Sequence, residues 1–294
     1  METRGTNAVR EWVLLEPRED GWRHLAEALS ITPLTARILW SRGIREADGA
    51  RRFLRPTLAD MHDPFSMKDM LAAVAEVLKA IERGQRIVIH GDYDVDGVSS
   101  VSLLYGFLRD IGANVTYYIP TRDADGYGLN SDTVRRLHAD GTGLIITVDC
   151  GVSNVEEITL ANELGMRTIV VDHHTIPPVL PPARAILNPL QVDCAFPFKH
   201  LAAVGVTFNF VVAIRSELRK RGVFKVVPEP DLARYLDLVA MGTIADVMPL
   251  VDENRLFVRM GLEILAKRRR AGISALMDRA SVEIGPVDAR TVSF

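Results

Sequence analysis

The sequence predicts an α/β protein built on a five-stranded parallel sheet flanked by helices. Between about residue 69 and residue 190, short apolar segments alternate with segments of helical periodicity, and this alternation is typical of βαβ units. The apolar segments are continuous, as in Leu144-Ile145-Ile146. Continuous apolar strands suit a sheet that helices cover on both faces.

The expected elements follow one another with short connections. Strands are predicted at 86–90, 114–119, 144–148, 168–171 and 185–187. Helices are predicted at 71–83, 98–111, 131–139, 154–164, 201–220, 231–245 and 255–270. Ser131 is the expected N-cap of its helix, because serine oxygens accept hydrogen bonds from the first turn. The proline-rich stretch from Pro177 to Pro182 is expected to be a loop.

A small helical segment is predicted to precede the sheet. Residues 22–42 carry apolar side chains at helical spacing, and Thr32-Pro33 is a start signal for the second half of that stretch. Arg55-Pro56 and Asp63-Pro64 indicate the end of this helical segment. We therefore place a boundary near Ser66.

Composition excludes several classes of protein. The 294 residues are 48% hydrophobic and 25% charged, which is typical of a globular protein. No apolar run reaches the roughly eighteen residues of a membrane span, and Met1 to Arg10 lacks the apolar core of a secretory signal. Two cysteines make no disulfide framework, so we expect a reduced cytoplasmic protein without membrane partners.

The net charge of −3 argues at first against a nucleic-acid partner. An aspartate-rich metal site would lower this sum without making a DNA-facing surface acidic. Basic clusters remain at 51–55, 219–221 and 267–270. Each is as compatible with a solvated helix face as with a phosphate contact.

Metal-ligand residue types follow three of the predicted strands. His90, Asp92, Asp94 and Asp96 follow the first strand, Asp149 the third, and Asp172-His173-His174 the fourth. Ligands of parallel sheets bind beyond the carboxyl ends of the strands. A single aspartate after a strand often caps the next helix. Capping does not explain a set of aspartates and histidines that follows three strands.

Converging carboxylates require a compensating charge. Two of them about 4 Å apart repel by roughly 4 kcal/mol at an effective dielectric of about 20. Mixed imidazole and carboxylate ligands suit Mn²⁺, Zn²⁺ or Fe²⁺, whereas an all-oxygen set suits Mg²⁺ or Ca²⁺. Asp246 is a further candidate, since it ends an apolar helix where the helix dipole disfavours an acid.

The ordered motifs resemble the DHH phosphoesterase superfamily and, within it, the bacterial RecJ exonucleases. They are HGDYDVDG at 90–97, DGYGLN at 125–130, TVDCGVSN at 147–154, VDHHTIPP at 171–178, ILNPL at 186–190 and GTIADVMPL at 242–250. The N-terminal string RGIREADGARRFLRPTLADMHDP is also similar to the segment that precedes the RecJ motifs. The resemblance thus covers nearly the whole chain, and it implies a DHH-type domain at 67–254.

The resemblance implies two divalent metal ions, Mn²⁺ foremost and Mg²⁺ as the other candidate. The ligands that it implies are His90, Asp94 and Asp149 for one ion, and Asp96, Asp149, His173 and Asp246 for the other. His174 would face the scissile phosphate, so that His174 and the bridging Asp149 are the expected catalytic residues. Asp172 would orient one of the histidines without being a metal ligand itself. Asp92 would only shape the loop after the first strand.

Three further residues are candidates for substrate binding. Arg122 would contact a phosphate, Tyr127 would stack on a base, and Gly128 would let the backbone approach the strand. A surface arginine and a plain turn with a buried tyrosine explain the same residues. RecJ proteins usually have glutamate where this chain has Asp125, and glycine where it has Ala203; both departures concern phosphate-loop geometry rather than the metal ligands.

The implied activity is hydrolysis of phosphodiester bonds in single-stranded DNA, from the 5′ end and with release of 5′ mononucleotides, in DNA repair and recombination. One alternative is another DHH phosphoesterase, acting on short RNA, cyclic dinucleotides or pyrophosphate. Another is a non-catalytic DHH scaffold, which the full ligand set disfavours. The resemblance gives no protein partner.

We also expect the chain to lack segments that follow the catalytic domain in the family. Residues 255–294 would be a connecting helix and the start of a second domain, and a domain for single-stranded DNA would follow. On this expectation the chain binds metal but degrades DNA poorly.

Overall fold

A computed structural model describes residues 20–121 and 128–293 and divides the chain into two compact units, Met1–Thr57 and Leu58–Phe294. The first unit packs α1 (Trp22–Leu29), α2 (Pro33–Ser41) and α3 (Ala47–Leu54) around a small apolar cluster centred on Leu25 and Leu39. The Thr32 hydroxyl accepts a hydrogen bond from the Thr35 amide (3.2 Å), which confirms Thr32-Pro33 as a helix start.

The second unit contains the predicted five-stranded parallel sheet. Its strand order is β2-β1-β3-β4-β5, and each neighbouring pair is parallel. The strands are β1 (Arg86–Gly91), β2 (Val115–Tyr118), β3 (Thr142–Val148), β4 (Arg167–Val171) and β5 (Ala185–Leu187). The fold class expected from the sequence is therefore confirmed.

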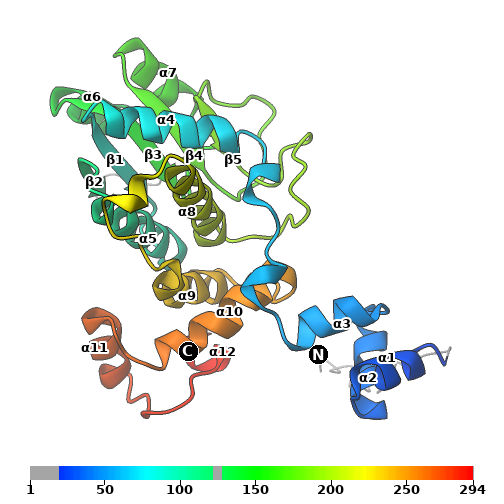
Figure 1. Ribbon diagram of the computed structural model, residues 1–294. Helices are drawn as coiled ribbons and strands as arrows, with labels where there is room; N and C mark the ends of the chain where they lie inside the picture. Colours follow the sequence, from blue (N-terminus) through cyan, green and yellow to red (C-terminus); the bar gives the residue numbers. More distant parts are fainter. Residues whose placement is uncertain (1–19, 122–127, 294) are drawn as a thin grey trace, which may run out of the picture. The chain divides into compact units, whose positions relative to one another are not determined.

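Helices surround this sheet and continue beyond it (Figure 1). They are α4 (Met70–Glu82), α5 (Val95–Asp110), α6 (Ser131–Ala139), α7 (Val155–Glu163), α8 (Ala203–Lys220), α9 (Leu236–Ala245), α10 (Asp252–Leu265), α11 (Ala271–Arg279) and α12 (Ala289–Ser293). Short 3₁₀ turns lie at Leu58–Asp60, Pro64–Ser66, Val223–Lys225 and Leu232–Tyr235. Over the described ranges, no helix is both long and apolar enough to span a bilayer.

Alternate side chains of each strand pack against different layers, because successive strand residues point to opposite faces. Ile87 and Ile89 of β1 join the large apolar cluster that includes α4, α5, α8 and α9. Val88 joins the second cluster, which includes α6 and α7. Figure 1 shows α4, α5 and α8 on one face of the sheet and α6 and α7 on the other. Both faces are thus covered, as continuous apolar strands require.

Several details differ from the sequence prediction; for example, the helix expected at 98–111 begins at Val95. Asn130, not Ser131, caps α6, because the Asn130 side-chain oxygen accepts from the Thr133 amide (2.8 Å). The helix expected at 255–270 begins at Asp252 and ends at Leu265, since Arg268 has a φ of +49°, which a helix cannot contain. The stretch 231–245 is a 3₁₀ turn followed by α9.

The strand order creates a switch point between β1 and β3. α5 follows β1 on one face, whereas α7 follows β3 on the other. Adjacent strands whose connections diverge in this way leave a crevice at their carboxyl ends, where ligands of open α/β sheets bind. The predicted chemical residues after β1 and β3 lie at this position.

Candidate metal centre

The turn after β1 presents three aspartates at the start of α5. Asp94 caps that helix, because its Oδ1 accepts a hydrogen bond from the Gly97 amide (2.9 Å). The turn is closely packed: a Cβ on Gly97 would lie 2.6 Å from the Asp92 carbonyl oxygen, which leaves room only for glycine. Asp92 and Asp96 are both buried beside this turn.

Asp149, directly after β3, is held in an unfavourable backbone conformation. Its φ is +61°, in the left-handed region, and its side chain is buried. The Asp149 amide donates to the Val171 carbonyl (2.9 Å), which fixes the residue to the end of β4. Non-glycine residues in this region cost on the order of 1–3 kcal/mol and cluster at functional sites. The surrounding chain therefore imposes the position of this carboxylate.

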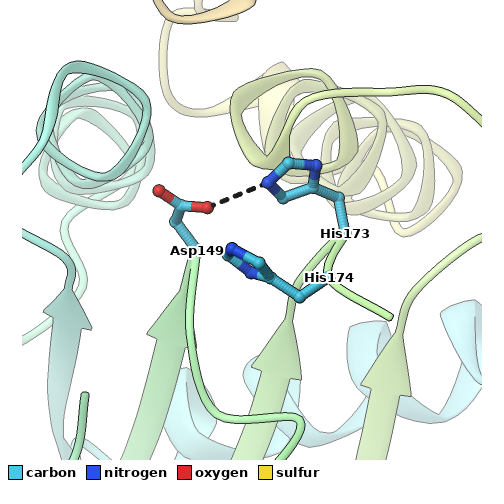
Figure 2. Close-up of side chains that lie close together, drawn as sticks. All are labelled: Asp149, His173 and His174. Atoms are coloured by element: carbon cyan, nitrogen blue, oxygen red, sulfur yellow. Dashed lines mark ion pairs between the residues drawn. The ribbon is translucent and has the colours of Figure 1, made fainter. Parts of the chain in front are cut away.

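Asp172, at the end of β4, organises the next two histidines. Its Oδ1 accepts from the His173 amide (2.7 Å), the His174 amide (3.1 Å) and His174 Nδ1 (2.7 Å). Its Oδ2 accepts from the Val152 amide of the loop after β3 (3.0 Å). The His174 ring is thus fixed through Nδ1, on a half-exposed side chain. Figure 2 shows both rings beside Asp149, with His173 directed toward its carboxylate.

Two further carboxylates come from helix ends. Asp96 accepts from the Ala203 amide (2.7 Å) and the Val204 amide (2.9 Å), so it satisfies the first amides of α8, whose own N-cap side chain makes no capping bond. Asp246 is the C-cap of α9, as predicted. These contacts bring residues that are far apart in the sequence to one edge of the sheet.

Three groups of side chains have ligand atoms close enough to share a metal ion. They are Asp149 with His173 and His174, Asp96 with His173 and Asp246, and Asp92 with Asp94 and Asp149. Within each group the ligand atoms lie within 4.8 Å of one another. His173 links two groups: its Nε2 is 3.3 Å from Asp149 Oδ1 (Figure 2), 3.8 Å from Asp96 Oδ2 and 3.7 Å from Asp246 Oδ2.

The electrostatics of the site reflect this crowding of acids. Burial, together with the charges of Asp94 and Asp172, raises the pKa of Asp149 to about 9. Burial likewise raises the pKa values of Asp96, Asp246 and Asp92. Each of these carboxyl groups is therefore costly to ionise unless a positive charge is close by.

In the half-exposed His174 and the buried Asp172, by contrast, the ionised forms are favoured. Hydrogen bonding to Asp172 raises the pKa of His174 to about 9. Burial opposes ionisation of Asp172, but the hydrogen bonds from His174 and the Val152 amide, together with the charge of His174, lower its pKa. The hydrogen bond between the two side chains thus favours the charged form of each.

The donor set fits divalent cations. Five carboxylates and two imidazoles converge, and the buried Asp92 Oδ1 accepts no hydrogen bond from the residues that the structure describes. Mixed nitrogen and oxygen donors suit Mn²⁺ and similar ions. Two of the groups share Asp149, so this carboxylate would help to hold divalent ions that activate water and stabilise phosphate oxygens.

The structure places the sequence-predicted ligands as follows. Five of them belong to the three groups: Asp94, Asp96, Asp149, His173 and Asp246. His90 is buried at the end of β1 but lies outside these groups; its Nδ1 is 3.8 Å from the sulfur of Cys150. The coordination of each residue stays a prediction.

Two residues in these groups were not predicted as ligands. Asp92 was expected only to shape the loop, and His174 only to face the phosphate, yet each joins a group that contains Asp149. The signal for Asp92 was its position directly after the strand end at Gly91. The sequence could not show that this side chain turns toward Asp149.

The predicted substrate residues are only partly described. Arg122 and Tyr127 lie outside the described residues. Gly128 has a φ of +75°, and a Cβ there would lie 3.3 Å from the Asn154 side-chain oxygen. A side chain at position 128 would be strained, which accounts for glycine without assigning it a substrate.

Comparisons with known proteins identify relatives over most of the chain. The family model described as "DHH family, N-terminal domain" matches residues 86–243. The single-stranded-DNA-specific exonuclease RecJ of Bacillus subtilis is 43% identical over 283 residues, which are 96% of this chain and 34% of that protein. The protein of the same name from Escherichia coli strain K12 is 39% identical over 90% of this chain and 46% of its own length.

Solved structures agree with this result. The crystal structure of RecJ in complex with Mn²⁺ from Thermus thermophilus has a TM-score of 0.76 and 32% identity, and the match covers 96% of this chain and 38% of that one. A structure of exonuclease RecJ bound to manganese has a TM-score of 0.68 and 33% identity, over 81% of this chain and 57% of the other. The chain thus spans roughly a third to a half of the RecJ sequences that it resembles.

Proposed function

The chain belongs to the DHH family, and on that premise we propose that it hydrolyses phosphodiester bonds in single-stranded DNA with divalent metal ions. One observation carries this proposal. Three acidic ligand groups lie at the switch point of the sheet, and they share Asp149 and His173 as common members. Similarity to single-stranded-DNA-specific exonucleases supports the choice of substrate.

We assign the metal ligands as Asp94, Asp96, Asp149, His173 and Asp246, with His90 completing the set and Mn²⁺ or Mg²⁺ as the ions. When bound, the ions supply the positive charge that activates a water molecule and stabilises the phosphate oxygens. Burial and mutual repulsion of the carboxylates support this assignment, because a cation would offset both.

His174 is proposed to bind the scissile phosphate. Asp172 holds Nδ1 of its ring and so fixes the orientation of the ring beside Asp149. Hydrogen bonding to Asp172 raises the pKa of the ring, and a protonated ring binds an anion more strongly than a neutral one. Asp172 therefore acts by fixing the orientation and charge of His174.

The cleavage is proposed to run from the 5′ end with release of 5′ mononucleotides, as part of DNA repair and recombination in the cytoplasm. Arg122, Tyr127 and Gly128 are the proposed contacts to the strand. Similarity to the RecJ exonucleases supports these assignments. We name no protein partner.

A direct test is digestion of 5′-labelled and 3′-labelled single strands with Mn²⁺, Mg²⁺ or a chelator. Mononucleotides released first from the 5′ label, in the presence of metal only, are expected. Asp149→Ala is the control for a contaminating nuclease. Cleavage of cyclic dinucleotides, short RNA or pyrophosphate in preference to long DNA would favour another DHH phosphoesterase, and no hydrolysis of any of them would favour a scaffold.

A further inference from the structure

A buried asparagine donates hydrogen bonds to two chain segments. One segment positions Asp96, and the other carries Asp246. Asn254 lies in the first turn of α10 and its side chain is fully buried. Its Nδ2 donates to the carbonyl oxygens of His200 (2.6 Å) and Pro249 (3.1 Å). Both N–H groups of one amide are thus engaged by two separate loops.

The first of these loops holds Asp96. The His200 carbonyl precedes the first turn of α8, where the Ala203 and Val204 amides donate to the Asp96 carboxylate. Ala202 gives α8 no side-chain cap, so these amides depend on Asp96 and on the path of the loop. A shift of residues 200–204 would move the Asp96 carboxylate with them.

The second loop carries Asp246. Pro249 lies in the segment that follows the C-cap of α9, and this segment includes Val247 with a φ of +56°. Such a strained turn persists only where the surrounding structure holds it. The bond from Asn254 to Pro249 is one such contact.

We infer that Asn254 is a positioning residue for the metal centre, which sets the spacing between Asp96 and Asp246. This inference rests on the proposed function of the same site. Asp96 Oδ2 and Asp246 Oδ2 lie 3.8 and 3.7 Å from the same atom, His173 Nε2. Metal–ligand distances are fixed to within about 0.2 Å, so a small relative shift of the two loops weakens coordination.

The chain offers a matched control in Asn209 of α8. This side chain is also fully buried, and its Nδ2 also donates twice, to the Gly205 carbonyl (3.1 Å) and to Glu253 Oε2 (3.0 Å). One of these bonds stays within α8, and neither reaches the loop at 200–202 or the turn at 246–249. Asn209→Ala therefore removes an equivalent buried amide without releasing either loop.

The experiment is calorimetric titration of the 294-residue chain with Mn²⁺, at a temperature where denaturant unfolding shows every variant to be folded. Asn254→Ala is expected to bind Mn²⁺ about ten-fold more weakly than the wild type, as for other residues that orient metal ligands. Asn209→Ala is expected to stay within about two-fold of the wild type, although both variants lose stability. The Mn²⁺ electron paramagnetic resonance spectrum should broaden or shift only in Asn254→Ala.

Equal Mn²⁺ affinity of Asn254→Ala and the wild type would overturn the inference alone, and so would equal losses in the two alanine variants. A wild-type chain that does not bind Mn²⁺ would overturn the proposed function together with the inference. If Asn254→Ala does not fold, Asn254→Ser, which retains one donor, is compared with Asn209→Ser, and the same order of affinities is required.

Discussion

At the scale of single residues, the metal centre combines side chains that are individually unfavourable. Asp149 is buried in a left-handed conformation, and Asp96 is buried beside other acids. Each feature costs free energy in a metal-free chain. Their coincidence at one sheet edge is the physical reason for assigning a cation to this place.

His174 and Asp149 are predicted to have separable roles. His174→Ala should leave Mn²⁺ affinity nearly unchanged and slow cleavage by about 100-fold, because it removes one donor to the phosphate. Asp149→Ala should lose both metal binding and activity, since Asp149 belongs to two ligand groups. Calorimetry and single-turnover cleavage measure the two effects. Equal loss of metal affinity in both variants would refute the division.

Val247 is predicted to destabilise the chain locally. It is 86% exposed with a φ of +56°, which is unfavourable for a β-branched residue. Val247→Gly should raise the free energy of unfolding by about 1 kcal/mol, because removal of the left-handed strain outweighs the added freedom of the unfolded chain.

The matched control for Val247 is Val251, which is 43% exposed and extended, with a φ of −124°. Val251→Gly should lower the free energy of unfolding by about 0.5–1 kcal/mol. Denaturant unfolding of the two variants measures both. The same sign of change in the two variants would show that left-handed strain is not what distinguishes Val247.

At the scale of elements, α8 and α9 pack against Asp96 of α5 and help to position its side chain. Gly242 of α9 lies so close to α5 and α8 that a Cβ there would be 2.8 Å from both Asp96 Oδ1 and Val204 Cγ1. The close approach of α9 to Asp96 therefore depends on glycine at this position.

Gly242→Ala is predicted to weaken the metal site through Asp96. The added methyl should lower the free energy of unfolding by about 1–3 kcal/mol, as other overpacked core substitutions do, and weaken Mn²⁺ binding by about ten-fold. Gly272 in α11 is the control, because a Cβ there would meet nothing within 4 Å. If Gly272→Ala weakens Mn²⁺ binding to the same extent, the close contact at Asp96 is not the cause.

At the scale of the whole molecule, metal binding and folding are expected to be linked. Ions that bind only the folded chain stabilise it by mass action, by about 2.7 kcal/mol at a free concentration of about 100 times the dissociation constant. Thermal unfolding should therefore occur at higher temperature with Mn²⁺ than with chelator. Asp149→Ala should show no such difference, and a wild-type chain indifferent to Mn²⁺ would contradict the assignment.

The parallel sheet could be predicted from the sequence because its signals are local. Continuous apolar segments, helical periodicity and their alternation all lie within windows of about ten residues, and the observed strands agree with the predicted ones to within about two residues. The helix ends were less certain: Asn130 and Ser131 are both good N-caps, and only the hydrogen bond to Thr133 distinguishes them.

The sequence by itself determined which residue types follow which strands, and parallel strands require those residues to meet at one edge. Only the tertiary structure decided their contacts: Asp92 joins Asp94 and Asp149, His90 lies beside Cys150, and Asn254 connects two loops. The reason is physical. Side-chain directions at a strand end depend on turn geometry and on packing between residues far apart in the chain, and no local pattern encodes either.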